Sequence, residues 1–173
     1  MKIKKCFLAC PLGNQNSEER DHADWLLKRL KNTFKGKEIE IIRADKITLQ
    51  GCINKQILEE IISADLLIAD LTWPNPNVFL ELGFRYAIGK PLIQIIKSDH
   101  KIPFDISTKR TIHYTTYKPE ILEKDIFSFL ESLEKHGFNS DYESLTHFYR
   151  VETDIPGNTI NQSSIEDNSI LEQ

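Results

Sequence analysis

The sequence predicts an α/β fold, a flavodoxin-like doubly wound parallel sheet of five strands in the order 2-1-3-4-5, covered on both faces to make three layers. Three observations predict it. Strand and helix patterns alternate about five times over residues 1–136 of the 173-residue chain. Several expected strands are nearly continuous in apolar character, which is typical of parallel strands covered on both faces. The expected helices each carry one apolar stripe.

The first half of the chain contains two strands and two helices. Residues 2–10 are mostly apolar and are expected to form a buried central strand. Ser17 and the two glutamates after it make an N-cap and an acidic first turn, which begin a helix that we expect to end at Gly36. A second strand is expected over residues 38–43. A helix after Gly51 is indicated by the apolar stripe of Ile53, Ile57, Leu58, Ile61 and Ile62.

The second half repeats this alternation. Residues 65–70 form a short apolar strand pattern with an aspartate at each end. Asn75 is expected to cap the next helix and Pro76 to occupy its first turn, while Gly89 ends it. The remaining elements are a fourth strand, a fifth strand and a closing helix, expected over residues 91–96, 111–114 and 119–136.

This α/β domain is expected over residues 1–138. From Phe138 onward Asn, Ser, Asp and Glu dominate, so residues 139–173 are expected to form a polar tail or linker. Within it, residues 142–151 fit a short helix. Such a tail is also a candidate contact for a partner.

The composition excludes several classes of function. The 22 Lys and Arg residues are outnumbered by 26 Asp and Glu, which gives a net charge of -4, so binding to nucleic acid or to a membrane surface is not expected. No apolar run approaches the roughly 20 residues that cross a bilayer, and the first residues lack a signal-peptide pattern. We therefore expect a cytoplasmic protein.

The cysteines and histidines predict no metal site. Cys6, Cys10 and Cys52, together with five dispersed histidines, show none of the spacings of zinc ligands. A disulfide framework is not expected either, because Cys6 and Cys10 belong to one strand, where they are expected to be small buried apolar side chains.

The strand order predicts where a ligand binds. In such a sheet, ligands lie beyond the carboxyl ends of the strands at which the order reverses, here the first and the third. This rule selects residues 10–14 and 70–77, with the start of the helix behind them. The candidate residues are Pro11, Leu12, Gly13, Asp70, Thr72, Trp73, Asn75, Asn77 and Glu81, and in addition Arg20 and Asp45.

These residue types suit a nucleotide. A carboxylate near a helix start, beside an aromatic ring and amides, can hold ribose hydroxyls or stabilise positive charge at an anomeric carbon. Across the crevice, the backbone N–H groups of residues 11–14, the amino end of the next helix and Arg20 suit a phosphate. Glu81 and Asp70 are therefore the catalytic candidates, and the others are candidates for binding the substrate.

Several of these residues also have a purely structural interpretation. Glu81 and Arg85 stand four residues apart in the favourable direction, so an exposed ion pair would explain both without a ligand. Arg43 and Asp45 could pair at the surface and contribute little to stability. Structural roles are also open for Asp65 as a strand terminus, Asn75 as a helix cap, Trp73 as a lid over its own loop and Arg20 as a solvated helix residue.

Four segments resemble the nucleoside 2-deoxyribosyltransferase-like superfamily. These are Phe-Leu-Ala-Cys-Pro-Leu-Gly at 7–13, Ser-Ala-Asp-Leu-Leu-Ile-Ala-Asp-Leu-Thr at 63–72, Asn-Pro-Asn-Val-Phe-Leu-Glu-Leu-Gly at 75–83 and Gly-Lys-Pro-Leu-Ile at 89–93. The segment from Val78 through Glu81 to Lys90 is also similar to the part of TIR domains that carries their NAD-cleaving glutamate. The resemblance covers about residues 3–135 and implies a flavodoxin-like core.

The resemblance implies a role for Glu81. It matches the glutamate that is the nucleophile of the deoxyribosyltransferases and that TIR enzymes need for nicotinamide loss. Gly13 and its neighbours match the loop that borders the substrate. The chain departs from the deoxyribosyltransferases at Asn75, where they have an acidic residue, and it leaves Asp70 or Asp45 to fill the place of their proton-handling aspartate.

This departure favours NAD as the substrate. A neutral base leaves poorly without an acid, whereas the pyridinium of NAD leaves as neutral nicotinamide and needs no proton. We therefore expect an N-glycosidase acting on a nucleotide, NAD above others, in bacterial defence or nucleotide signalling and without a cofactor. The alternatives are a non-catalytic nucleotide sensor and a nucleoside 2-deoxyribosyltransferase. A homo-oligomer is also expected, because TIR-like enzymes often complete their sites between subunits.

Overall fold

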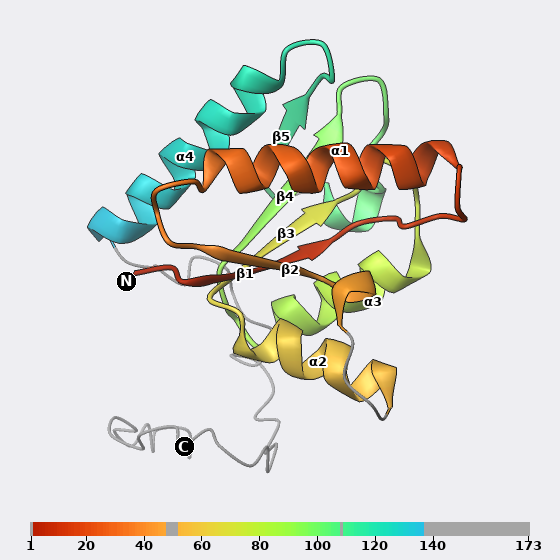
Figure 1. Ribbon diagram of the computed structural model, residues 1–173, viewed down its shortest axis with the longest axis horizontal. Coiled ribbons are helices and arrows are strands. Elements are labelled where there is room, and N and C mark those ends of the chain that lie inside the picture. Colours follow the sequence, from red (N-terminus) through yellow and green to blue (C-terminus); the bar gives the residue numbers. More distant parts are fainter. Residues whose placement is uncertain (1, 48–51, 108, 137–173) are drawn as a thin grey trace, which may run out of the picture.

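A computed structural model of the chain describes residues 2–47, 52–107 and 109–136. Its five strands form one parallel sheet in the order β2-β1-β3-β4-β5, which confirms the predicted flavodoxin-like topology (Figure 1). The strands are β1 (Lys5–Ala9), β2 (Glu40–Arg43), β3 (Leu66–Asp70), β4 (Leu92–Lys97) and β5 (Thr111–Tyr114). The tail and the helix expected at 142–151 lie outside the described residues.

Four helices cover the sheet in two layers. Figure 1 shows α1 and α4 on one face and α2 and α3 on the other, so the molecule has the predicted three layers. The helices are α1 (Glu18–Thr33), α2 (Ile53–Ser63), α3 (Pro76–Ala87) and α4 (Pro119–His136). Two short 3-10 turns, Ala44–Lys46 and Phe104–Ile106, lie in the loops after β2 and β4. None of the described helices is long and apolar enough to cross a bilayer.

The alternation of side chains along β3 separates two cores. Leu66 and Ile68 belong to the cluster under α1 and α4, whereas Leu67 and Ala69 belong to the cluster under α2 and α3. Because successive strand residues point to opposite faces, Asp70 lies on the α1 and α4 face. This alternation decides which predicted site residues meet.

The predicted helix starts are confirmed. Ser17 caps α1 by accepting a hydrogen bond from the backbone N–H of Arg20 at 3.2 Å, and Asn75 caps α3, with Pro76 as the first helical residue. The helix α1 ends at Thr33, three residues before Gly36, which adopts a positive φ of 92° in the following turn. The glycine therefore serves the turn after the helix, since this conformation favours glycine.

Some strand ends differ from the prediction. The first strand is regular only from Lys5, because the backbone N–H groups of Lys4 and Lys5 donate to the carboxylate of Asp65 at 2.8 and 3.0 Å. This confirms the structural interpretation of Asp65. The second strand begins at Glu40, since Glu38 has a φ of 55° and cannot continue an extended strand. Cys6 and Cys10 are buried and unpaired, as predicted.

Candidate active site

A cavity of about 660 Å³ opens at the carboxyl ends of β1 and β2, between α2 and α3. Of the two segments at the predicted switch point, residues 10–13 and 75–77 contribute to its lining, whereas the end of β3 does not, and the end of β2 takes its place. The described residues that line it are Leu8, Cys10, Leu12, Gly13, Arg43, Ala44, Asn54, Ile57, Leu58, Ile61, Asn75, Asn77, Val78, Leu80, Glu81 and Phe84. Most of these side chains are apolar, so the cavity suits a flat base better than a fully polar ligand.

Glu81 is the one carboxylate among the described residues that line this cavity. The cap at Asn75 sets the start of α3, and Glu81 follows four residues after Asn77, on the same side of the helix. Within the described part of the chain, Glu81 makes no recorded hydrogen bond or ion pair. Burial raises the pKa of its carboxyl group to about 7, so both protonation states are populated near neutral pH.

The expected ion pair between Glu81 and Arg85 does not form. Arg85 is fully buried and donates to the backbone oxygens of Ile61 at 2.7 Å, Ala64 at 2.9 Å and Pro91 at 2.9 and 3.1 Å. Burial lowers the pKa of Arg85 to about 10. Its role is to hold α3 against the carboxyl end of α2, and the structural explanation for Glu81 is therefore wrong.

The loop after β1 forms the wall opposite α3. Leu12 and Gly13 line the cavity, while Pro11 is buried beside them. Gly13 has a φ of 55°, and a Cβ at this position would collide with the hydroxyl of Ser17 and lie 2.9 Å from the Cβ of Glu19. The loop therefore needs glycine to turn this tightly into the cap of α1.

Asn75 and Asn77 both line the cavity, as predicted. The side-chain oxygen of Asn75 accepts from the backbone N–H of Asn77 at 3.0 Å and of Val78 at 3.4 Å, which confirms its role as a cap. Asn77 is an exposed residue, and its side chain has no recorded partner within the described residues.

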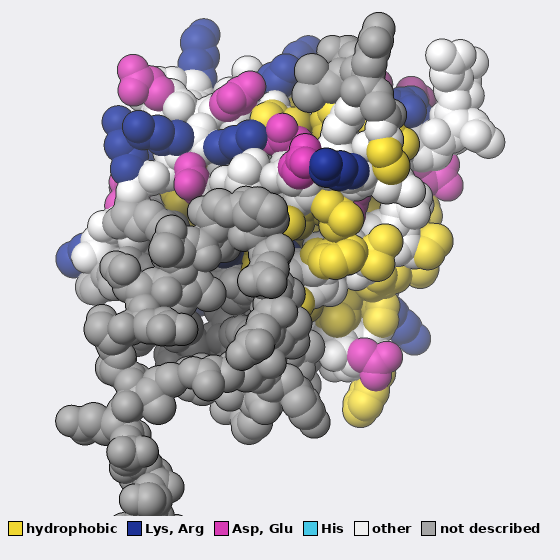
Figure 2. All heavy atoms as spheres, turned by 90° about the horizontal axis from the view of Figure 1, so that it is seen from below, with side chains coloured by type: hydrophobic (Ala, Val, Ile, Leu, Met, Phe, Trp, Pro, Cys, Tyr) yellow, Lys and Arg dark blue, Asp and Glu magenta, His cyan; other side chains and the backbone are white. Residues whose placement is uncertain are grey.

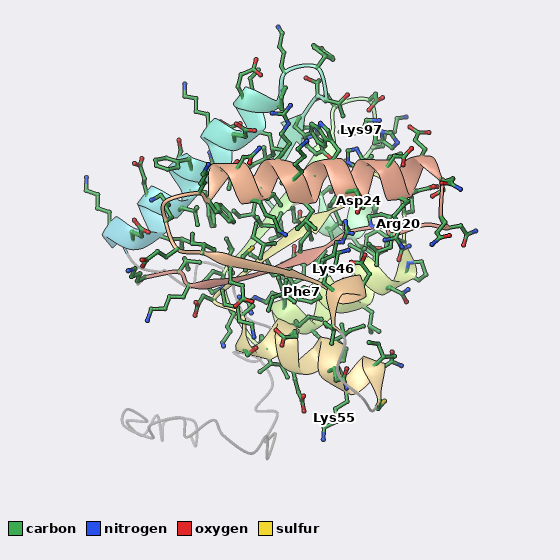
Figure 3. All side chains as sticks on the ribbon, viewed as in Figure 1. Phe7, Arg20, Asp24, Lys46, Lys55 and Lys97 are labelled. Carbon is green, nitrogen blue, oxygen red and sulfur yellow. The ribbon has the colours of Figure 1, made fainter. Side chains whose placement is uncertain are left out.

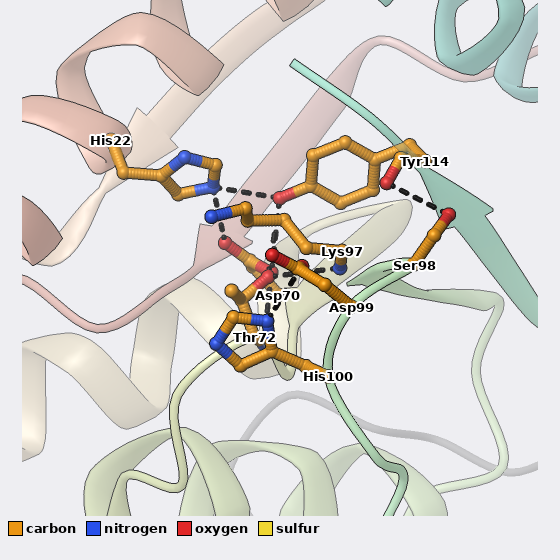
Figure 4. A network of polar contacts seen from close by, with 8 residues as sticks. All are labelled: His22, Asp70, Thr72, Lys97, Ser98, Asp99, His100 and Tyr114. Atoms are coloured by element: carbon orange, nitrogen blue, oxygen red, sulfur yellow. Dashed lines mark hydrogen bonds and ion pairs between the residues drawn. The ribbon is translucent and has the colours of Figure 1, made fainter.

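Asp70 and Thr72, which were also predicted site residues, are not among the described residues that line the cavity. Asp70 is fully buried on the α1 and α4 face, in a network with Thr72, His22 and Tyr114 (Figure 4). One carboxylate oxygen accepts from the backbone N–H of Thr72 at 3.1 Å, from its hydroxyl at 2.5 Å and from the Tyr114 hydroxyl at 3.3 Å. The other oxygen lies 3.2 Å from Nε2 of His22, which is also 2.7 Å from the Tyr114 hydroxyl.

Trp73 covers this network and is not among the described residues that line the cavity. Its ring packs edge-on against His22 and His100, with centroids 5.1 and 5.5 Å apart, and Nζ of Lys97 lies 5.2 Å from its centroid. The backbone N–H of Lys97 donates to the Thr72 hydroxyl at 3.2 Å. Asp70, Thr72 and Trp73 thus form one structural unit that joins the ends of β3, β4 and β5 to α1.

Arg20 and Asp45 belong to a charged cluster behind the cavity wall. Asp45 accepts from Arg43 at 2.6 and 2.9 Å and from Arg20 at 2.9 Å, and these bonds hold its pKa below the usual range although burial acts in the opposite direction. Asp24 of α1 binds the same Arg43. Figure 3 shows Arg20, Asp24 and Lys46 gathered near the end of β2. Arg43 and Asp45 do pair, but Arg43 is only 1% exposed, so the expected surface pair is wrong.

Some residues of the cavity were not predicted. Helix α2 contributes Asn54, Ile57, Leu58 and Ile61, whose apolar members were interpreted only as core. The width of the apolar stripe of α2 could have indicated these residues. Ile57 and Leu58 are adjacent and cannot both face the sheet, so one of them had to face another surface. The face that carries the cavity also exposes apolar side chains, which gather there in Figure 2. On α2 and α3 the large exposed ones are Ile53, Leu80 and Phe84.

No family model matches the sequence, and no curated protein matches it significantly. Solved structures do. The chain is similar to a 2-deoxyribosyltransferase from Bacillus psychrosaccharolyticus, at 20% identity and a TM-score of 0.55, over 73% of this chain and 95% of that one. It is also similar to the CMP N-glycosidase BcmB from Clostridium botulinum, at 19% identity and a TM-score of 0.51, over 71% of this chain and 99% of that one. The chain therefore shares its fold with these two proteins.

A 2-desoxiribosyltransferase from Leishmania mexicana also matches, at 23% identity and a TM-score of 0.45. The match covers 54% of this chain, and the chain spans 64% of the length of that protein. The strand order and the fold shared with the first two structures confirm the flavodoxin-like architecture that the four sequence segments implied. The similarity to TIR domains stays a prediction.

Proposed function

We propose that this chain acts on the N-glycosidic bond of a nucleotide, with Glu81 as the carboxylate at the anomeric carbon. The observation that carries the proposal is the position of Glu81, unpaired within the described residues and facing a cavity large enough for a nucleoside. The fold shared with a 2-deoxyribosyltransferase and a CMP N-glycosidase supports the same class of reaction.

The cavity supplies what this reaction needs from the protein. Apolar side chains of α2 and α3 exclude water from the base, and Asn77, one turn before Glu81, is placed to hold ribose hydroxyls. Gly13 and the loop around it bring backbone N–H groups to the opposite side, whereas Arg20 is bonded to Asp45 and does not line the cavity. Asp70 has no place in this scheme, because its carboxylate is already bound by Thr72, Tyr114 and His22.

NAD is the substrate that we propose within this class. Among the described residues that line the cavity, no second carboxylate stands beside Glu81 to protonate a leaving base. Nicotinamide needs no proton, because the electron pair of the broken bond neutralises its pyridinium nitrogen. The positive charge of the bound pyridinium would also favour the ionised form of Glu81.

The proposed reaction proceeds in two steps. A carboxylate oxygen of Glu81 bonds to the anomeric carbon while the bond from that carbon to the ring nitrogen breaks, and neutral nicotinamide leaves. Water then bonds to the same carbon, the Glu81 carboxylate departs and one proton is released to solvent. The products are ADP-ribose and nicotinamide.

The biological setting is part of the proposal. The similarity of residues 78–90 to TIR domains supports NAD cleavage in the cytoplasm, in bacterial defence or nucleotide signalling. Assembly into a homo-oligomer is proposed on the same ground, and contact with a partner through residues 139–173 is proposed because of the polar composition of that segment.

The test is incubation of the protein with NAD, CMP and a panel of nucleosides, followed by mass detection of the released base. Glu81→Gln should lower release roughly a thousandfold or more, because it removes the nucleophile and retains the shape. Glu59→Gln, which changes an exposed glutamate of α2, is the matched control and should leave release unchanged. Unaltered release by Glu81→Gln would contradict the proposal.

The same panel separates the two alternatives. Thermal stabilisation by a nucleotide without any released base indicates a sensor. Exchange of one base for another on a deoxynucleoside indicates a transferase. Release of nicotinamide with formation of ADP-ribose supports the proposed glycosidase.

A further inference from the structure

Phe84 is a large aromatic residue that neither the core nor the reaction scheme explains. It is 37% exposed on α3 and is not a member of either core cluster. Leu80, four residues earlier on the same helix, is 60% exposed. Single exposed apolar side chains are common in proteins, but apolar side chains gathered beside a hollow are typical of a ligand-binding groove. The position of Phe84 relative to the cavity is therefore informative.

Phe84 lines the same cavity as Glu81. The residues of α3 that line this cavity are Asn77, Val78, Leu80, Glu81 and Phe84. At about 100° of rotation per residue, they occupy one continuous side of the helix, and Phe84 lies on that side between Leu80 and Asn77. Leu82, which packs in the core, lies on roughly the opposite side. The aromatic ring and the carboxylate therefore belong to one wall of one site.

The order of these side chains along α3 matches the order of groups in a nucleotide. A helix rises about 1.5 Å per residue, so Asn77 lies about 6 Å before Glu81 and Phe84 about 4.5 Å after it. Each step is about the width of a sugar or base ring. A substrate with its anomeric carbon at Glu81 and its ribose hydroxyls near Asn77 therefore has its base at the level of Phe84.

Helix α2 forms the opposite wall of the cavity, and this wall is mostly apolar. Three of the four side chains that α2 contributes are the aliphatic ones of Ile57, Leu58 and Ile61. An aromatic ring on one wall and aliphatic side chains on the other suit a flat base, because both of its faces can then be buried. A phosphate or a sugar hydroxyl would find no partner between these groups.

We propose that the ring of Phe84 stacks on the leaving base of the nucleotide and that Phe84 thereby selects the base. This inference rests on the proposed function, since it places the anomeric carbon at Glu81. The face of an aromatic ring attracts a cation, so Phe84 is expected to favour a pyridinium over an uncharged ring of the same size. Such a preference agrees with the NAD-type substrate proposed above.

The first experiment measures the affinity for nicotinamide mononucleotide by calorimetry, in a Glu81→Gln background so that the ligand is not consumed. Phe84→Ala removes the ring, and we expect the affinity to fall about tenfold or more. Phe84→Tyr keeps the ring and should keep the affinity within about threefold. Rescue by tyrosine distinguishes stacking from a general disturbance of α3.

Phe127→Ala is the matched control. Phe127 is also 37% exposed and also belongs to a helix, but that helix is α4 on the other face of the sheet, and Phe127 does not line the cavity. The affinity should change less than about twofold. Both alanine variants are expected to fold, because neither side chain is buried and alanine favours a helix. Thermal denaturation checks this.

A second ligand tests the preference for a pyridinium. Reduced nicotinamide mononucleotide carries the same substituents on an uncharged dihydropyridine ring. With Phe84 present, the oxidised form should bind about fivefold more tightly than the reduced form, and Phe84→Ala should lose this difference. Equal affinity for the two forms with Phe84 present would overturn the preference.

A loss of affinity in Phe84→Ala that neither Phe84→Tyr nor Phe127→Ala shows supports the inference. A folded Phe84→Ala variant that binds like its parent, an equal loss in Phe127→Ala, or no binding of either ligand would overturn it. So would unchanged binding by a Phe84→Ala variant that dissociates an oligomer in size-exclusion chromatography, since the ring would then serve a subunit contact. Binding that depends on Phe84, without base release by the protein with Glu81 intact, would refute only the proposed glycosidase.

Discussion

Two carboxylates near the carboxyl edge of the sheet have opposite environments. Asp70 on the α1 and α4 face accepts hydrogen bonds from Thr72 and Tyr114 and contacts His22, with no exposed surface. Glu81 on the α2 and α3 face has no recorded partner among the described residues and lines a cavity. A position at the carboxyl edge of the sheet makes a residue a candidate for ligand binding. The face of the sheet on which its side chain lies then decides whether the residue can contact a ligand.

The largest effect on stability is expected at Asp70. Asp70→Asn removes a buried charge that orients Thr72, Tyr114 and His22, and it places an N–H₂ group where acceptors are needed. We expect a loss of about 3 kcal/mol in the free energy of unfolding, measured by urea denaturation. Base release by the fraction that stays folded should be retained. Normal stability combined with lost activity would reverse the roles given to the two carboxylates.

The next largest expected effect is the change of activity with pH. Glu81 must be ionised to act as the proposed nucleophile, and burial raises its pKa to about 7 in the free protein. The value of kcat/KM should therefore fall about tenfold for each pH unit below about 7 and level off above it. A rate that rises as the pH is lowered would mean that Glu81 acts as a proton donor.

Glu81→Gln should make the protein more stable at alkaline pH. The folded pKa of about 7 lies above the reference value of 4.5, so ionisation of Glu81 costs stability as the pH rises from about 4.5 to about 7. Glutamine avoids this cost, and we expect a gain of about 2–3 kcal/mol at pH 8 and none at pH 4. Thermal denaturation at both pH values, with Glu59→Gln as a control, measures it. An equal gain at pH 4 would exclude ionisation as the cause.

The smallest effect is expected at the edge of the Asp70 network. Tyr114→Phe removes a buried hydroxyl that contacts His22 at 2.7 Å and Asp70 at 3.3 Å, while Thr72 still donates to Asp70. The expected loss is about 1 kcal/mol in urea denaturation. A loss as large as that of Asp70→Asn would show that the network depends on the tyrosine rather than on the carboxylate.

Much of the fold follows from local patterns. Ser17 and Asn75 cap their helices because a side-chain oxygen accepts from the first free backbone N–H groups, which requires only neighbouring residues. The strand at 111–114 and the helix at 119–136 have the predicted bounds. The strand at 2–10 was predicted too long, because its first residues bind Asp65, which is 60 positions away in the chain.

The candidate site was predicted less completely. The switch-point rule found Leu12, Gly13, Asn75, Asn77 and Glu81, all of which line the cavity. It also selected Asp70 and Thr72, although alternation along β3 places Asp70 on the same face as Leu66 and Ile68, and this could have been noticed. The burial of Arg43 and Arg85 could not have been predicted from the sequence, since both residues depend on partners from other elements.

The order of residues determined the strands, the helices, their caps and the parallel topology, because these depend on side-chain periodicity and on nearby hydrogen bonds. Packing decided the rest. Glu81 has no partner among the described residues because Arg85 donates to the backbone carbonyls of Ile61 and Pro91, and Arg43 is buried because Asp24 and Asp45 bind it. Such competition for partners arises only when distant segments meet, and it determines which charged groups remain available to a ligand.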